Sequence, residues 1–257
     1  HDLSLNAGGS VALNDTVNVG GAVQIQSASD LFANGDLTTG GALAFTAAGN
    51  VNQASGQAIH AGLTLAGTAQ SWNMQAGSTL AADQGLSVST AGSQTLAQVV
   101  SGTGLALDAG GDVSLNERVR AGGDAAINAG GTLLLADGQL VSADGNFASQ
   151  SASFRMGSGS ALVAGADAHV AVRGDAQLSV LMAAGNVVVA AEASLTLNDA
   201  VGAGGAAQIT SGAGIAVNGN LEAAGTMSLS ASDAVHQAAG TAVHAGGALT
   251  ASAAAWD

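Results

Sequence analysis

The chain has 257 residues, a net charge of −14, 39 glycines, and neither proline nor cysteine; its four basic residues are all arginine. The negative charge disfavours nucleic acid and anionic membrane surfaces as partners, and the lack of cysteine excludes disulfides and thiol chemistry. No stretch approaches the ~20 apolar residues that a membrane-spanning helix requires. We therefore expect no nucleic-acid partner and no membrane insertion, whereas the 47% hydrophobic fraction predicts an ordered chain.

A short apolar alternation ends in a glycine turn and restarts about every 20 residues, which is the signature of a solenoid. The first such unit is Asp2–Gly21, and one of the last is Thr226–Gly247. The coils end at Gly21, Gly41, Gly62, Gly85, Gly104, Gly123, Gly145, Asp167, Gly185, Gly205, Gly225 and Gly247, and a thirteenth begins at Ala248. A solenoid has no natural central pocket, so we expect function at its lateral faces and corners.

Within each coil the apolar residues alternate with a period of two, as Leu105, Leu107, Val113 and Leu115 do. Short alternating runs on either side of a glycine-rich corner predict strands rather than helices. The pattern predicts one right-handed parallel β-helix of about 12–13 coils spanning residues 1–257. A leucine-rich-repeat horseshoe has a similar period, but its LxxLxLxxN signature is missing.

Several coils share a similar second half, such as VALNDTV at Val11–Val17 and VSLNERV at Val113–Val119. In each of them an asparagine follows an inward apolar residue. Asparagine tolerates the left-handed conformation and hydrogen-bonds nearby backbone, and amides in register form ladders. We therefore predict structural corner roles for Asn14, Asn116, Asn198 and Asn218.

The recurring AGG corners, at Ala7–Gly9, Ala109–Gly111 and Ala129–Gly131, and the VxLN(D/E)xV half-coils resemble the repeat region of the filamentous haemagglutinin family. This family comprises large exoproteins of two-partner secretion systems. The resemblance implies an internal fragment of a longer fibrous adhesin, secreted through an outer-membrane partner and displayed at the bacterial surface. It implies attachment to host cells and no cofactor.

One coil, Ala168–Gly185, carries Arg173, Gly174 and Asp175. Aligned on LALDAGGDVSL, Val172 matches Leu107, so that the tripeptide falls at a corner where other coils have Asp-Ala-Gly. The other corners follow a pattern of glycine and asparagine that serves the scaffold. This corner departs from that pattern, and we expect that the scaffold does not need its residues. Integrins read Arg-Gly-Asp: the carboxylate completes a metal site, the guanidinium pairs with a carboxylate, and glycine lets the backbone bend. We predict an integrin-binding site there, as the family resemblance also implies.

Other candidate residues are Trp72 and Trp256, each of which could stack on a host glycan. Trp72 lies in the longest coil, where we expect a bulge. His60, His236 and His244 are dispersed, and HQAAGTAVH contains no cysteine or carboxylate at ligand spacing, so no metal site is predicted.

Two other function classes are open. The same coils could form the passive stalk of a contact-dependent toxin-delivery exoprotein, which needs no ligand. A polysaccharide-degrading β-helix enzyme needs clustered acids with a lysine or arginine in one groove. The chain has no lysine and scattered arginines, so we expect no enzyme.

Overall fold

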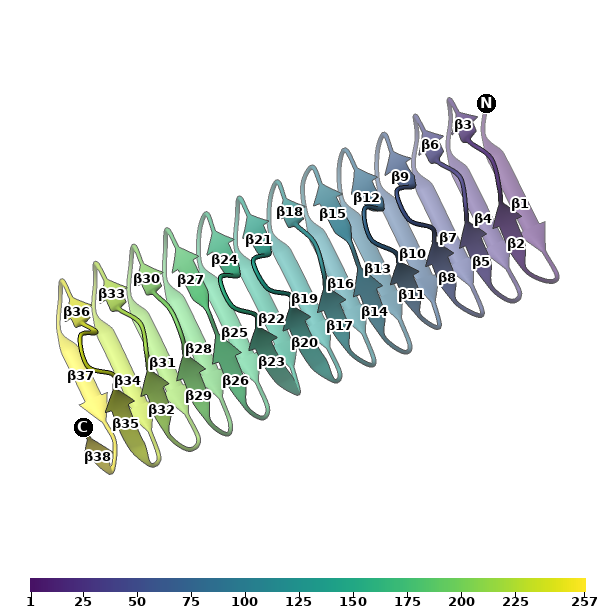
Figure 1. The fold of residues 1–257 in the computed structure, drawn as a ribbon. Coiled ribbons are helices and arrows are strands. Elements are labelled where there is room, and N and C mark those ends of the chain that lie inside the picture. The colour runs from purple at the N-terminus through teal and green to yellow at the C-terminus, as the bar shows by residue number, and fades with distance from the viewer. The chain divides into compact units, whose positions relative to one another are not determined.

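The computed structural model describes residues 1–257, which form strands and turns without any helix. The coils form three parallel sheets, which we name A, B and C in chain order (Figure 1). Each coil contributes one strand to each sheet, except that the last coil adds none to sheet C, which has 12 strands where A and B have 13. The result is a β-solenoid of about 13 turns with roughly 20 residues per turn, so the predicted parallel β-helix is confirmed. No segment is a helix long and apolar enough to cross a membrane.

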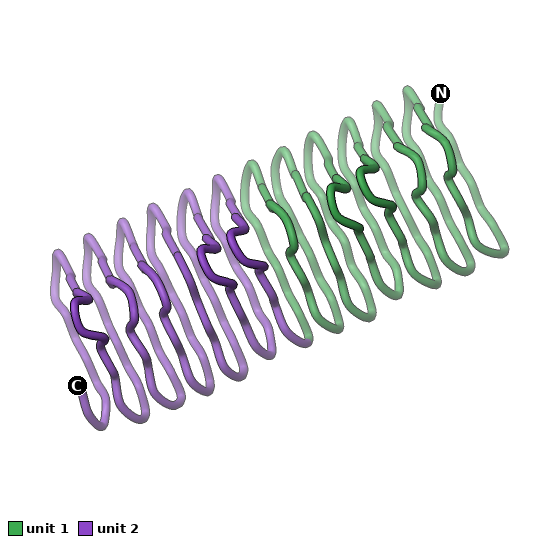
Figure 2. Tube along the Cα trace, viewed as in Figure 1, with its two compact units in different colours: residues 1–130 green, residues 131–257 purple.

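The chain divides into two compact units, His1–Gly130 and Gly131–Asp257 (Figure 2). Each coil begins with its strand in sheet A. A first corner joins sheet A to sheet B, a second corner joins B to C, and a third corner leads to the next coil.

The strands of the first unit are as follows. Sheet A contains β1 (Leu3–Ala7), β4 (Val23–Ser27), β7 (Leu43–Ala47), β10 (Leu65–Ala69), β13 (Leu86–Thr90), β16 (Leu105–Ala109) and β19 (Ala125–Ala129). Sheet B contains β2 (Val11–Leu13), β5 (Leu31–Ala33), β8 (Val51–Gln53), β11 (Trp72–Met74), β14 (Gln94–Leu96) and β17 (Val113–Leu115). Sheet C contains β3 (Val17–Val19), β6 (Leu37–Thr39), β9 (Ala58–Ala61), β12 (Thr79–Ala82), β15 (Gln98–Ser101) and β18 (Val119–Ala121).

The second unit repeats the arrangement. Sheet A contains β22 (Phe147–Ser151), β25 (Ala168–Val172), β28 (Val187–Ala191), β31 (Ala207–Ser211), β34 (Met227–Ala231) and β37 (Leu249–Ser252). Sheet B contains β20 (Thr132–Leu135), β23 (Ser153–Met156), β26 (Ala176–Leu178), β29 (Leu195–Leu197), β32 (Ile215–Val217), β35 (Ala234–Gln237) and β38 (Ala255–Trp256). Sheet C contains β21 (Leu140–Ala143), β24 (Ala161–Ala164), β27 (Val180–Ala183), β30 (Val201–Ala203), β33 (Leu221–Ala223) and β36 (Val243–Ala245).

The core follows from the period of two. On β4, Val23 and Ile25 are buried while Gln24 between them is exposed, because successive side chains of a strand point to opposite faces. The next coil pairs in register, so that Ile25 lies beside Phe45. Buried positions therefore form columns of apolar side chains from coil to coil inside the solenoid.

One large side chain in the first unit needs a glycine to fit. Trp72 is fully buried and packs edge-on against Phe45, with ring centroids 5.9 Å apart. Gly67 occupies an inward position on β10, and a Cβ there would lie 2.2 Å from the Trp72 ring. Glycine is present because any larger residue would overlap the indole.

The coils of the two units also repeat over a longer distance. Residues 65–124 and residues 147–206 each contain three coils and are offset by 82 positions, as Leu65 and Phe147 are. Eight of their nine strands have matching bounds; only β23 starts one residue earlier than β11 does at that offset. We call these stretches the first and second segments, and residues 82 apart counterparts.

Within each segment, the second corners of successive coils differ in length. The first coil of each has a four-residue second corner that contains a left-handed glycine, Gly77 (φ 74°) or Gly159 (φ 67°). The next coil has a one-residue second corner, Ala97 or Ser179. The longer corners bulge from the trace in both units, as Figure 2 shows.

Candidate functional site

The Arg-Gly-Asp tripeptide forms the whole first corner between β25 and β26. Arg173 and Asp175 are exposed, and Gly174 is half-buried. The predicted corner position is therefore confirmed.

The predicted register of this corner is wrong by two residues. Val172 ends β25 and takes the place that Ala109, not Leu107, has at the end of β16. Arg173, Gly174 and Asp175 accordingly replace Gly110, Gly111 and Asp112 rather than Asp-Ala-Gly. The error arises because a shift of two residues leaves an alternating pattern unchanged.

Asp175 is hydrogen-bonded to the next coil. Its Oδ1 accepts hydrogen bonds from the Ser194 hydroxyl and from the Ser194 backbone N–H at 3.1 Å. These bonds, the hydroxyl one first, hold the pKa of Asp175 below its ordinary value of 3.8. Asp175 is therefore an ionised carboxylate at neutral pH, with its other oxygen, Oδ2, not hydrogen-bonded.

The same position serves the scaffold in other coils. Ser93, the counterpart of Asp175, accepts a hydrogen bond from the Asp112 N–H at 3.0 Å, and Asp30 accepts one from the Asn50 N–H at 2.7 Å. A carboxylate or hydroxyl at the end of the first corner thus satisfies a corner amide one coil later, which would otherwise lack an intramolecular partner.

Packing within the scaffold also explains why position 174 is a glycine. A Cβ at this position would lie 2.8 Å from the Ala152 carbonyl oxygen of the preceding coil, and one at its counterpart Gly92 would lie 2.9 Å from the Gln70 carbonyl oxygen. The expectation that the scaffold needs none of the three residues is therefore wrong for Gly174 and Asp175. It holds for Arg173, whose counterpart is Ala91 and whose guanidinium has no hydrogen bond or ion pair.

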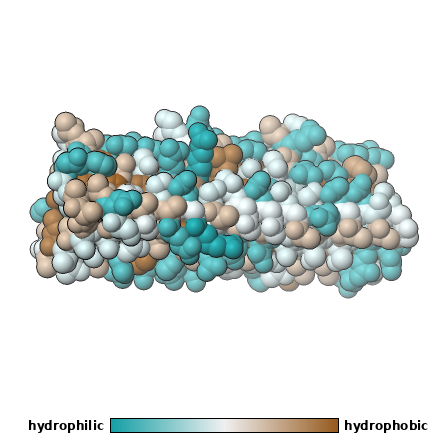
Figure 3. Space-filling view, turned by 90° about the horizontal axis from the view of Figure 1, so that it is seen from below, coloured by the Kyte–Doolittle hydropathy of each residue, from teal (hydrophilic) through white to brown (hydrophobic).

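The two charged side chains border different hollows. Arg173 lines a hollow of about 280 Å³ together with Gln150 and Glu192. Asp175 lines another, of about 460 Å³, on the outer face of sheet B with Arg155 and Gln177. Figure 3 shows hydrophilic side chains in separate clusters, with residues of intermediate hydropathy and hydrophobic residues between them.

The two tryptophans differ in their access to solvent. Trp72 is fully buried in the core, so the prediction that it contacts a glycan is wrong. It lies within strand β11 rather than in a bulge; the bulge of this coil is the turn that contains Gly77. Trp256 on β38 is 41% exposed, so a stacking role for it stays a prediction.

The four predicted corner asparagines all lie at second corners, directly after sheet B strands. Ladders form at two of the places: Asn34 Nδ2 donates to Asn14 Oδ1 at 2.9 Å, and Asn218 Nδ2 donates to Asn198 Oδ1 at 3.4 Å. Asn116 is fixed through its backbone N–H, which donates to the Leu96 carbonyl. No residue other than glycine has positive φ, so the left-handed conformation expected of these asparagines does not occur.

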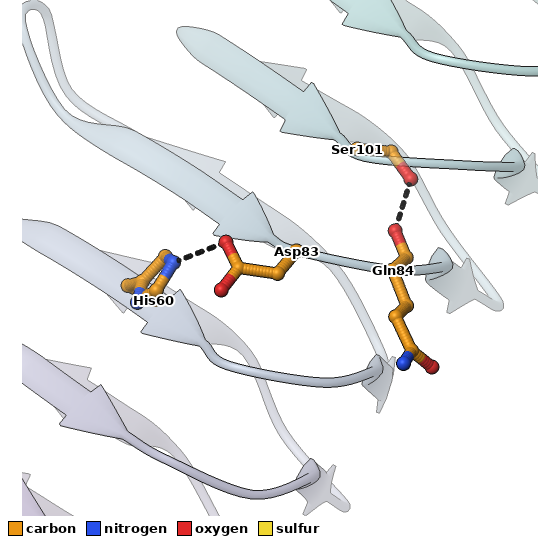
Figure 4. A network of polar contacts seen from close by, with 4 residues as sticks. All are labelled: His60, Asp83, Gln84 and Ser101. Atoms are coloured by element: carbon orange, nitrogen blue, oxygen red, sulfur yellow. Dashed lines mark hydrogen bonds and ion pairs between the residues drawn. The ribbon is translucent and has the colours of Figure 1, made fainter.

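Histidines pair with single carboxylates between neighbouring coils. Figure 4 shows His60 Nε2 facing Asp83 Oδ1 at 2.9 Å, beside the bond that the Ser101 hydroxyl donates to the Gln84 carbonyl at 2.8 Å. His236 pairs with Asp257 in the same way. No group of three or more histidine, aspartate or glutamate side chains lies where it could hold a metal ion.

No family model, curated protein or solved structure matches the chain.

Proposed function

We propose that this chain is a scaffold segment of a secreted bacterial adhesin of the filamentous haemagglutinin type, and that it presents Arg173–Asp175 to a host-cell integrin. The observation that carries the proposal is Arg173, an exposed and unpaired cation at a corner where the scaffold requires no side chain. The full-length protein is secreted through an outer-membrane partner and acts at the cell surface without a cofactor and without catalysis.

The charges of the corner suit this role. Asp175 is ionised and keeps one oxygen for a divalent ion in the receptor, a match of hard cation and oxygen ligand. The Arg173 guanidinium pairs with a receptor carboxylate through two parallel N–H donors. Arg173 and Asp175 border different hollows of the corner, as a receptor that contacts the two charges separately requires.

A passive stalk is the second candidate, and a specific observation favours it. At Gly174 and at Gly92 a larger residue would meet a carbonyl oxygen of the preceding coil, and Asp175 and Ser93 each accept a hydrogen bond from the next coil. Two of the three residues are therefore explained by the scaffold alone. A stalk of a toxin-delivery exoprotein would need nothing more.

Cell adhesion separates the two candidates. Integrin-bearing cells are allowed to attach to immobilised chain in the presence of Mg²⁺. We expect Arg173→Ala, which copies Ala91, to reduce attachment about tenfold or more, because a charge-assisted bidentate pair is lost.

Two further variants complete the experiment. Asp175→Ser copies Ser93, keeps the acceptor for Ser194 and removes the charge, so it should abolish attachment without unfolding the corner. Arg118→Ala, an arginine elsewhere, is the control and should attach as the parent does. Unchanged attachment by both corner variants would establish the passive stalk instead.

A further inference from the structure

The one-residue second corners leave a notch beside the preceding four-residue turn. In the first segment, Glu117 lies two coils after Gly77, and its side chain extends back across this notch. Its Oε1 accepts a hydrogen bond from the Gly77 N–H at 2.7 Å, although 40 residues separate the two. The carboxylate thus closes the notch above Ala97.

The second segment lacks this closure. The counterpart of Glu117 is Asp199, which is shorter by one methylene, and its carboxylate accepts a hydrogen bond from the Ser179 hydroxyl. Ser179 replaces Ala97, so the Asp199 carboxylate is held at the preceding coil and does not extend one coil further to Gly159. The Gly159 N–H, which corresponds to that of Gly77, has no acceptor in the chain.

The open notch is a hollow of about 750 Å³ in the second unit. Arg155 projects into it from the outer face of sheet B, flanked in register by Leu134 and Gln177. Its guanidinium has no hydrogen bond or ion pair. Its counterpart, Asn73, instead donates to Asn52 of the preceding coil.

The unpaired groups of the notch define the ligand. Asp137 and Asp199 also line it, but each already accepts a hydrogen bond, from the Ser158 N–H at 2.9 Å and from Ser179. Three lining groups have no partner, the Arg155 guanidinium, the Gln177 amide and Asn198 Nδ2, and each can donate. The unpaired Gly159 N–H belongs to the turn whose residues Gly157 and Ser158 line the notch, and it is a donor as well. They match a carboxylate, which accepts several charge-assisted hydrogen bonds at once.

We propose that this notch binds the acidic side chain of a protein partner, with a glutamate carboxylate accepting from Gly159 N–H and pairing with Arg155. Glu117 is an intramolecular example of such a ligand, because it occupies the corresponding notch with a side chain from a protein corner. In a peptide, such a glutamate is flanked by backbone N–H groups and cationic side chains. These groups form pairs with the remaining carboxylate oxygens of Asp137 and Asp199. The site is separate from Arg173 and Asp175.

The Glu117 corner supplies the probe. A capped peptide, Ser-Leu-Asn-Glu-Arg-Val, copies residues 114–119 and is titrated into the full chain at millimolar concentrations, with NMR detection. We expect saturable shifts of the Gly159 amide and the Arg155 Nε–H signals. The peptide with glutamine in place of glutamate, and the variant Arg155→Asn, should each bind about tenfold more weakly, since each removes a charge-assisted pair.

A double variant reproduces, in the second segment, the contact by which Glu117 closes the notch of the first segment. Asp199→Glu combined with Ser179→Ala should place a carboxylate on Gly159 N–H, abolish peptide binding and slow exchange of the Gly159 amide. Arg173→Ala is the control and should bind the peptide as the parent does. Equal binding of the glutamine peptide, or unchanged binding by Arg155→Asn or by the closed variant, would overturn the proposal. Equally tight binding of free glucuronate would overturn the assignment to a protein partner.

Discussion

Residues 65–124 and residues 147–206 have nearly the same strands but different side chains, and three of the differences change the packing, a corner and a notch. Trp72 with Gly67 becomes Phe154 with Ser149, the Ala91–Ser93 corner becomes Arg173–Asp175, and the notch closed by Glu117 becomes an open one. The backbone is kept in each case, because the strands inside each segment pair in register with one another. Inward residues therefore change together so that the core stays filled, a corner acceptor is kept although its residue type changes, and outward positions are free to acquire charge.

The largest effect should come from the core of the first segment. Trp72→Ala removes a fully buried indole and should lower the free energy of unfolding by about 3–5 kcal/mol, from lost burial and the resulting cavity. Chemical denaturation measures it. Trp256→Ala, at an exposed site, should have little effect; a similar loss from both variants would contradict the difference in burial.

Each segment combines one small and one aromatic residue at two core positions. Exchanging the pair of one segment for that of the other tests whether the two positions compensate for each other. Gly67→Ser should cost about 1–3 kcal/mol, because the new side chain overlaps the indole, and adding Trp72→Phe should relieve most of that cost. The double variant copies Ser149 and Phe154. A double-mutant cycle on unfolding free energies gives the coupling, and additive effects would show that the two positions do not compensate.

The closure by Glu117 should have a smaller and local effect. Glu117→Asp shortens the side chain so that it no longer reaches Gly77, as Asp199 does not reach Gly159. We expect exchange of the Gly77 amide to rise about fivefold, which corresponds to a hydrogen bond of about 1 kcal/mol. NMR-detected exchange compares the two glycines, and Glu222→Asp serves as a control elsewhere. Equal exchange at Gly77 and Gly159 in the parent chain would refute the difference between the notches.

The smallest effect should be the pH dependence of the Arg173–Asp175 corner. The folded-state pKa of Asp175 is lowered, so its contribution to stability is complete above its ordinary pKa of 3.8 and is lost as pH falls through the folded value. Asp175→Ser should remove this dependence, because Ser93 performs the same role without titrating. Denaturation midpoints of parent and variant below pH 4 are the measurement; parallel pH profiles would show that the Ser194 bonds do not stabilise the fold.

Much of the fold could be predicted from the residues, and less of the candidate site. Leu105, Leu107, Val113 and Leu115 indicate two inward-facing strands on either side of a corner, and the structure has them. The placement of Trp72 could not be predicted, because it depends on Gly67 and on Phe45 in the preceding coil. The longer repeat had a signal in the sequence: the half-coils that contain Asn116 and Asn198 lie 82 residues apart.

Local patterns in the sequence predict the coil length, the strands on either side of a glycine-rich corner and the corner at Arg173–Asp175, because alternation and glycine turns are local properties of the chain. The number of three strands per coil came from the structure. The tertiary structure decided which corner atoms meet. Only the pairing of coils about 20 residues apart gives Asp175 its bond to Ser194, leaves Arg155 unpaired, and lets Glu117 close one notch while Asp199 leaves the other open. These contacts depend on register, and an alternating pattern is the same after a shift of two residues.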